Sequence, residues 1–181
     1  MDVFVVGVGN PWASDDGVGV AAVRRLQSEY IATSQLRHDQ DRAEPPQITF
    51  LILPQPAVEL IELMDRCKLL IVIDAVQSGA PPGTIHHEVW RPHLADSRGV
   101  ERASSHGLGI GQVLNLAAAL KRLPEQVILW GVEIASTEPG PGLSPDVAAA
   151  VPCLVDRLCQ ALAAYLKEGE HCLQAHPNGL D

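Results

Sequence analysis

The sequence predicts an α/β fold with a largely parallel central sheet of about five strands. Short apolar runs rich in valine, isoleucine and leucine alternate along the chain with segments of helical periodicity. Uniformly apolar strands are typical of a parallel sheet whose two faces are both covered. With 181 residues, 46% of them hydrophobic, the chain is large enough for one domain with its own core. We therefore expect a single domain over residues 1–167, followed by a loose polar tail over residues 168–181.

The first strand is expected over residues 3–6, which read Val-Phe-Val-Val. It should stop at residues 7–11, Gly-Val-Gly-Asn-Pro, because glycine allows unusual backbone angles and proline lacks the N–H group needed for strand pairing. A helix should begin near Asp15, with Ser14, Asp15 and Asp16 as capping residues at its positive end. This strand-to-helix turn therefore carries two adjacent carboxylates.

The next elements are a surface loop, a strand, a helix and another strand. Residues 31–47 are polar and end in prolines, which predicts the loop. Residues 48–53 form the strand, and residues 57–67 carry apolar side chains at helical spacing. Residues 69–73, Leu-Leu-Ile-Val-Ile, read as a buried strand that ends on Asp74.

The last part of the chain predicts two more strands and two more helices. Residues 84–89 are expected as a strand at one edge of the sheet, and residues 107–122 as a helix. Residues 127–134 are the last apolar strand. The final helix should begin at residues 144–146, Ser-Pro-Asp, with proline in its first turn.

Charge and composition exclude several classes of function. The formal net charge of -9 argues against nucleic-acid binding, which depends on cationic side chains, and favours a basic or neutral protein partner. The longest apolar run, residues 69–73, is too short to cross a bilayer, and the apolar start has no basic flank typical of a signal peptide. We therefore expect a cytoplasmic protein.

Three side chains are candidates for one functional site. Asp16 follows the first strand, Asp74 ends the strand at residues 69–73, and His106 lies where a loop enters the next helix. Ligands of open α/β sheets bind at the carboxyl ends of the strands, so we expect these side chains to meet at one edge. Two carboxylates and an imidazole suit a divalent transition metal and leave positions open for a substrate.

Each of these residues also has a simpler explanation. An aspartate at a helix start, like Asp16, is usually a cap, and His106 alone would more often be a capping or hydrogen-bonded histidine. Asp74 could make a strand-end hydrogen bond, although an unpaired carboxylate is costly to bury after five apolar residues. The case for a site therefore depends on all three occurring at matching ends of different elements.

Other motifs fit less well. Gly7-Val8-Gly9 begins like a dinucleotide fingerprint, but Trp12 occupies the third glycine position. Asp15 and Asp16 would also repel a pyrophosphate at that helix start. Ser104 and Ser105 beside His106 are not on a strand-to-helix elbow of the kind that serine hydrolases use.

Several short motifs together resemble one known family. They are Gly7-Val8-Gly9-Asn10, Asp15-Asp16-Gly17-Val18-Gly19, Ile73-Asp74-Ala75-Val76, Pro82-Gly83-Thr84, Ser105-His106, Gly131-Val132-Glu133 and Gly142-Leu143-Ser144-Pro145. In this order and spacing, from residue 2 to about residue 166, the chain resembles the [NiFe]-hydrogenase maturation endopeptidases. The resemblance implies a three-layer αβα fold and a selective peptidase.

The resemblance also implies a substrate, a metal and site residues. Such enzymes remove a C-terminal extension from the precursor of a [NiFe]-hydrogenase large subunit after nickel insertion. The family's metal-contacting residues correspond to Asp16, Asp74 and His106, and the nickel would be supplied by the precursor rather than held by the free enzyme. We expect a monomer. A non-enzymatic nickel-sensing chaperone or docking factor for the same precursor is the alternative.

Two departures from the family pattern stand out. The first metal-contacting residue is often glutamate in relatives, whereas Asp16 is one methylene shorter. Residues 53–57, Leu-Pro-Gln-Pro-Ala, replace a loop of the Asp-Gly-Gly-Thr type found in many members. No acid stands there, so no catalytic role of that loop is carried over to this chain.

Overall fold

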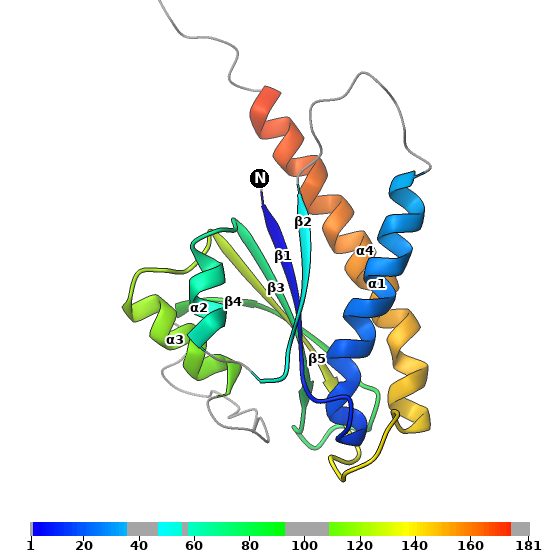
Figure 1. Cartoon of the computed structure of the whole chain (residues 1–181). Coiled ribbons are helices and arrows are strands. Elements are labelled where there is room, and N and C mark those ends of the chain that lie inside the picture. Colours follow the sequence, from blue (N-terminus) through cyan, green and yellow to red (C-terminus); the bar gives the residue numbers. More distant parts are fainter. Residues whose placement is uncertain (1, 36–46, 56–57, 93–108, 175–181) are drawn as a thin grey trace, which may run out of the picture.

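The computed structural model describes residues 2–35, 47–55, 58–92 and 109–174, and Figure 1 shows one sheet between two layers of helices. The strand order is β2-β1-β3-β5-β4, and neighbours are parallel except for the antiparallel pair β4 and β5. The elements are β1 (Val3–Val8), η1 (Ser14–Gly17), α1 (Val18–Gln35), β2 (Ile48–Leu53), α2 (Val58–Met64), β3 (Leu69–Val76), β4 (Ile85–Trp90), α3 (Ile110–Ala119), β5 (Gln126–Glu133) and α4 (Pro145–Gln174). This arrangement confirms the predicted α/β fold with a mostly parallel five-stranded sheet.

Each face of the sheet has its own core. Helices α1 and α4 cover one face, and α2 and α3 cover the other (Figure 1). Because successive strand residues point to opposite faces, Val5 packs toward α1 and α4, while Phe4 and Val6 pack toward α2 and α3. Both faces are therefore apolar, which explains why the strands read as unbroken apolar runs.

Strand β1 is longer than predicted, because it continues through Gly7 to Val8. Gly7 pairs with Ile52 on one side and Ile73 on the other. A Cβ at Gly7 would lie 2.4 Å from the carbonyl oxygen of Gly19. The glycine therefore does not end the strand; it lets α1 pack closely against β1.

Helix boundaries differ most from the sequence expectations. A short 3-10 helix, η1, precedes α1, and its N-cap is Ala13 without a side-chain hydrogen bond, so Ser14, Asp15 and Asp16 do not cap it as predicted. The loop predicted to begin at residue 31 begins later, because α1 continues to Gln35. In the last third of α1, Tyr30 packs on Phe50 of β2 at a ring-centroid distance of 5.7 Å, which holds this part of the helix against the sheet. Helix α3 ends at Ala119, close to Lys121, whose φ of 57° is a left-handed conformation typical of helix ends.

Helix α4 extends beyond residue 167, where the loose tail was expected to begin. It reaches Gln174, since a formed helix adds further residues at little cost and one glycine interrupts it only weakly. Within α4, Pro145–Leu166 is apolar and long enough to cross a membrane by length and composition alone. Its buried side chains, among them Val147, Leu154 and Leu158, instead form part of the core against the sheet.

Candidate functional site

Asp16 lies in η1, the element that follows β1 after the turn at residues 9–13, and is 5% exposed. Its Oδ2 accepts a hydrogen bond from the backbone N–H of Asn10 at 2.7 Å, which fixes the carboxylate against the preceding turn. The turn passes close to it through Gly9, whose φ is 131° and whose Cβ would lie 1.9 Å from the Asp16 carbonyl oxygen. Only glycine fits at this position, so the turn holds Asp16 in a defined place.

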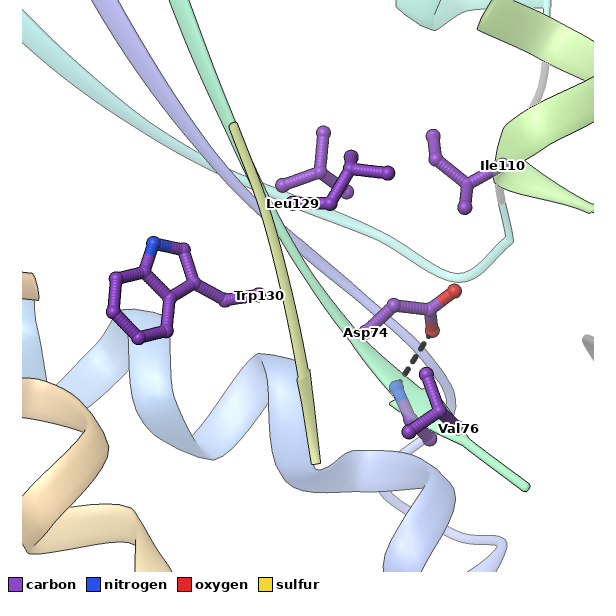
Figure 2. Close-up of a pocket in the computed structure, with 7 residues that line it drawn as sticks. Asp74, Val76, Ile110, Leu129 and Trp130 are labelled. Carbon is purple, nitrogen blue, oxygen red and sulfur yellow. Dashed lines mark hydrogen bonds between the residues drawn. The ribbon is translucent and has the colours of Figure 1, made fainter. Parts of the chain in front are cut away.

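Asp74 lies inside β3, two residues before its end, rather than just past the strand as predicted. Its Oδ1 accepts a hydrogen bond from the backbone N–H of Ala75 at 2.8 Å. Figure 2 shows its carboxylate on the same side of the sheet as Leu129 and Ile110, while the indole of Trp130 points away on the other side.

A small recess adjoins Asp74. It has a volume of about 10 Å³, room for about one water molecule, and most of the residues around it are apolar. Ile110, the first residue of α3, belongs to this lining. The recess is too small for a ligand of its own, but it places Asp74 beside apolar surface where charge interactions are stronger than in water.

The two carboxylates belong to neighbouring strand ends. Strands β1 and β3 are adjacent and parallel, with Gly7 paired to Ile73, so their carboxyl ends meet at one edge of the sheet. The 3-10 helix that carries Asp16 contacts β3. His106 lies outside the described residues, and within them no group of three histidine, cysteine or acidic side chains gathers at metal-binding distance. A shared ion therefore stays a prediction for Asp16, Asp74 and His106.

Asp15 has a different function from the capping role predicted for it. It is fully buried, and its carboxylate accepts hydrogen bonds from the chain 120 residues further on. The donors are the backbone N–H groups of Ala135, Ser136 and Ser144 at 3.0, 3.2 and 2.6 Å and the Ser144 hydroxyl at 2.9 Å. Burial alone would raise the pKa of Asp15, but these hydrogen bonds outweigh burial and hold it below its usual value. Asp15 thus joins the loop after β1 to the loop after β5.

Glu133, the last residue of β5, is a second buried carboxylate at this edge. Its oxygens accept hydrogen bonds from the backbone N–H groups of Ser78 and Gly79 at 2.7 and 2.8 Å and from the Ser78 hydroxyl at 2.7 Å. The Nε2 atom of His86 lies 3.2 Å from Glu133 Oε2. Burial raises the pKa of Glu133, yet the hydrogen bonds from Ser78, Gly79 and His86 together lower it. Glu133 therefore fixes the loop that follows β3.

The lowered pKa of Glu133 predicts a pH-dependent contribution to stability. Because the folded pKa lies below its usual 4.5, the carboxylate stabilises the fold fully at neutral pH, and this stabilisation is lost as the pH falls through the folded pKa. We expect Glu133→Gln to lower the free energy of unfolding by about 2 kcal/mol at neutral pH, and by progressively less as the pH falls through the folded pKa. Urea unfolding at several pH values measures this.

A matched control for Glu133→Gln is Glu125→Gln. Glu125 is 64% exposed at its side chain and pairs with Lys68 at 3.0 Å on the surface. Its replacement should change the free energy of unfolding by no more than about 0.5 kcal/mol. A Glu133→Gln effect that is equally small, or that grows as the pH falls, would contradict the assigned role.

The sequence contains a signal that could have identified Glu133. Like Asp74 after the apolar run at residues 69–73, Glu133 is an acid that follows the apolar stretch of β5. Asp15 is harder to recognise, because its partners Ala135, Ser136 and Ser144 are all distant in sequence.

The turn after β1 is not built for a dinucleotide phosphate. Such a site needs free backbone N–H groups at the start of the helix. Here the N–H of Ser14 donates to the carbonyl of Gly140 at 2.9 Å, and the N–H of Asp15 donates to the carbonyl of Ser136 at 3.2 Å. These contacts agree with the sequence argument against nucleotide binding.

Comparison with known proteins gives a consistent result. A family model described as hydrogenase maturation protease matches residues 39–161, a range that includes Asp74 and His106. The hydrogenase 2 maturation protease of Escherichia coli strain K12 is 29% identical over 163 residues, which cover 90% of this chain and 91% of that protein. A hydrogenase expression/formation protein, HupD, from Thiocapsa roseopersicina is 27% identical and matches 91% of this chain and 69% of its own length.

Solved structures agree with the sequence matches. The hydrogenase maturating endopeptidase HybD from E. coli has a TM-score of 0.67 at 27% identity, with 91% of this chain and 94% of that chain covered. The solution structure of an endopeptidase from Escherichia coli has a TM-score of 0.70 at 28% identity, with the same coverage. The strand order and helical layers described above are thus similar to those of known peptidases.

Proposed function

Because the chain belongs to the hydrogenase maturation protease family and is therefore a peptidase, we propose that it processes a [NiFe]-hydrogenase large-subunit precursor after nickel insertion. The reaction removes the C-terminal extension of that precursor. Asp16, Asp74 and His106 contact the nickel that the precursor carries, so the metal enters the site as part of the substrate. The contact fixes which peptide bond lies beside the two carboxylates.

The observation that supports this proposal best is the position of the two aspartates. Asp16 lies in η1, after β1, and Asp74 lies near the end of β3, the adjacent parallel strand; each accepts a hydrogen bond from a nearby backbone N–H group. Carboxylate oxygens held in this way are preorganised ligands for a divalent transition metal. Little rearrangement is then needed when the metal arrives with the substrate.

His106 is the third proposed contact. It precedes Ile110 by four residues, and Ile110 lines the recess beside Asp74. An imidazole added to two carboxylates completes a ligand set that nickel accepts.

Hydrolysis can follow two routes with the same residues. In both, a water oxygen bonds to the scissile carbonyl carbon, the C–N bond breaks, and a proton passes to the leaving nitrogen. In the first route the nickel polarises the carbonyl or the water. In the second route nickel only positions the bond, and a carboxylate of the site takes the proton from the water as general base.

The direct test uses the precursor with and without nickel. Mass spectrometry after incubation with the purified chain should show loss of the C-terminal peptide only from the nickel-loaded precursor. Equal cleavage of both forms would contradict nickel recognition. Cleavage of neither form would contradict the proposed substrate.

The alternative of a non-enzymatic docking factor is not favoured, since the family is one of peptidases. A cytoplasmic location and a monomeric state, both expected from the sequence, stay predictions.

A further inference from the structure

Two loops at the carboxyl edge of the sheet form one continuous rim, which we define as residues 10–16 and 135–144. Figure 1 shows the loops after β1 and after β5 at the same end of the molecule. The N–H of Ser14 donates to the Gly140 carbonyl at 2.9 Å, and the N–H of Gly140 donates to the Trp12 carbonyl at 2.9 Å. The carboxylate of Asp15 adds its bonds to Ala135, Ser136 and Ser144. The rim is therefore fixed by both backbone and side-chain contacts.

Trp12 stands on this rim with its side chain in solvent. It is 72% exposed, the highest value among the exposed large hydrophobic residues of the described chain. Its backbone is nevertheless held on both sides, since its N–H donates to Asn10 Oδ1 at 3.0 Å and its carbonyl accepts from Gly140. A large aromatic ring exposed on a fixed backbone is typical of a binding anchor, which loses little conformational freedom when a partner covers it.

Other exposed apolar residues belong to the same rim as Trp12. Ala13 and Gly140 form a parallel β-bridge, which brings the two strips of loop side by side. Pro11, before Trp12, and the prolines on either side of Gly140 are all exposed. We call Pro11, Trp12, Pro139 and Pro141 the rim patch. It presents apolar surface on rigid backbone directly beside the candidate site.

We propose that the rim patch is the docking surface for the polypeptide chain of the precursor next to the scissile bond, with Trp12 as its anchor. This inference rests on the proposed function and names where that substrate binds. The rim patch is continuous with the candidate site, because the N–H of Asp16 donates to the Ala13 carbonyl at 3.1 Å, so the residue after Trp12 and the proposed metal contact are parts of one turn. A peptide held on Trp12 is thereby presented to Asp16 at a fixed register.

The experiment compares Trp12→Ala and Trp12→Phe with Leu120→Ala as the control. Leu120 is 53% exposed and follows α3 at the end away from Ile110, so it offers exposed apolar surface far from the recess beside Asp74. The nickel-free precursor is not expected to be cleaved, so its binding gives Kd without turnover. Cleavage of the nickel-loaded precursor gives KM and kcat separately.

For Trp12→Ala we expect Kd and KM to rise about tenfold or more, because truncation of an aromatic anchor removes much of the binding energy. The kcat at saturation should stay within about twofold, since the ring does not touch the reacting bond. Trp12→Phe should recover most of the affinity, and Leu120→Ala should change neither constant. Thermal unfolding of all three variants should match that of the unsubstituted chain.

Unchanged Kd and KM in Trp12→Ala would overturn the proposal, as would an equal rise in Leu120→Ala. If Trp12→Ala instead converts a dimer into a monomer with Kd unchanged, the patch belongs to a second copy and the proposal is wrong. A different result would contradict the proposed function alone. If Trp12→Ala weakens binding of the precursor but the unsubstituted chain releases no peptide from the nickel-loaded form, the docking surface is supported and the proposed reaction is contradicted.

Discussion

Replacement of Asp74 by asparagine should abolish processing of the nickel-loaded precursor while leaving the fold intact. Asparagine keeps the size of the side chain and a carbonyl oxygen that can accept the hydrogen bond from Ala75, which the aspartate accepts at 2.8 Å. It lacks the negative charge that a metal contact or a general base requires. We expect the cleavage rate to fall at least about a hundredfold, the range found when such a group is lost.

The measurement is the rate of peptide release under single-turnover conditions, together with the thermal unfolding midpoint. Asp156→Asn is a matched control, since Asp156 is an exposed aspartate on the helix α4. It should cleave at the rate of the unsubstituted chain. Full activity in Asp74→Asn would remove Asp74 from the site, and a large loss of thermal stability would mean that its effect is structural.

Replacement of Asp15 by asparagine should cause the largest loss of stability of any conservative change at this edge. Its carboxylate is fully buried and accepts hydrogen bonds from three residues of the loop after β5, Ala135, Ser136 and Ser144. Asparagine places an NH₂ group against some of these donors and leaves buried N–H groups unpaired. We expect the free energy of unfolding to fall by about 3 kcal/mol.

Urea unfolding at neutral pH measures this effect, with Asp146→Asn as the control. Asp146 is an exposed acid in the first turn of α4, so its replacement should cost less than about 1 kcal/mol. Asp15→Asn should also slow cleavage, because the loop that it fixes adjoins Asp16. A loss of stability no larger than that of Asp146→Asn would show that the contacts of Asp15 contribute little.

The sheet could be predicted from the sequence because its strands have a direct physical signature. Strands β1, β3 and β5 are covered on both faces, so every position favours an apolar residue, and their order of alternation with helices implies parallel pairing. The ends of the elements are harder to predict. Gly7 predicts the end of β1 in the sequence, whereas in the structure its lack of a side chain allows close packing against Gly19 in α1.

Part of the candidate site follows from the same pattern. Asp74 is a candidate because an unpaired carboxylate is costly to bury after an apolar strand, and Asp16 is one because it follows the first strand. The structure places both at the carboxyl edge of the sheet, and their contact with a metal stays a prediction. The structural roles of Asp15 and Glu133 depend on backbone N–H groups that any residue carries. Glu133 is paired with Ser78 and Gly79 across more than 50 positions, and such contacts leave no local pattern in a sequence.

The neighbouring positions of Asp15 and Asp16 illustrate the difference. They are identical in type and both are buried, yet one fixes the rim and the other is the proposed metal contact. Residue type and local spacing do not separate these two roles. The hydrogen-bond partners do, since Asp15 accepts hydrogen bonds from a distant loop, whereas Asp16 accepts one from Asn10 in the adjacent turn.

Contact of Asp16, Asp74 and His106 with the nickel of the precursor at one site can be measured by X-ray absorption at the nickel edge. Spectra are compared for the nickel-loaded precursor alone and for its rapidly frozen complex with this chain. Complex formation should add oxygen and nitrogen ligands to the nickel, and Asp74→Asn should reduce the change. Identical nickel spectra for the free and bound precursor would contradict this contact.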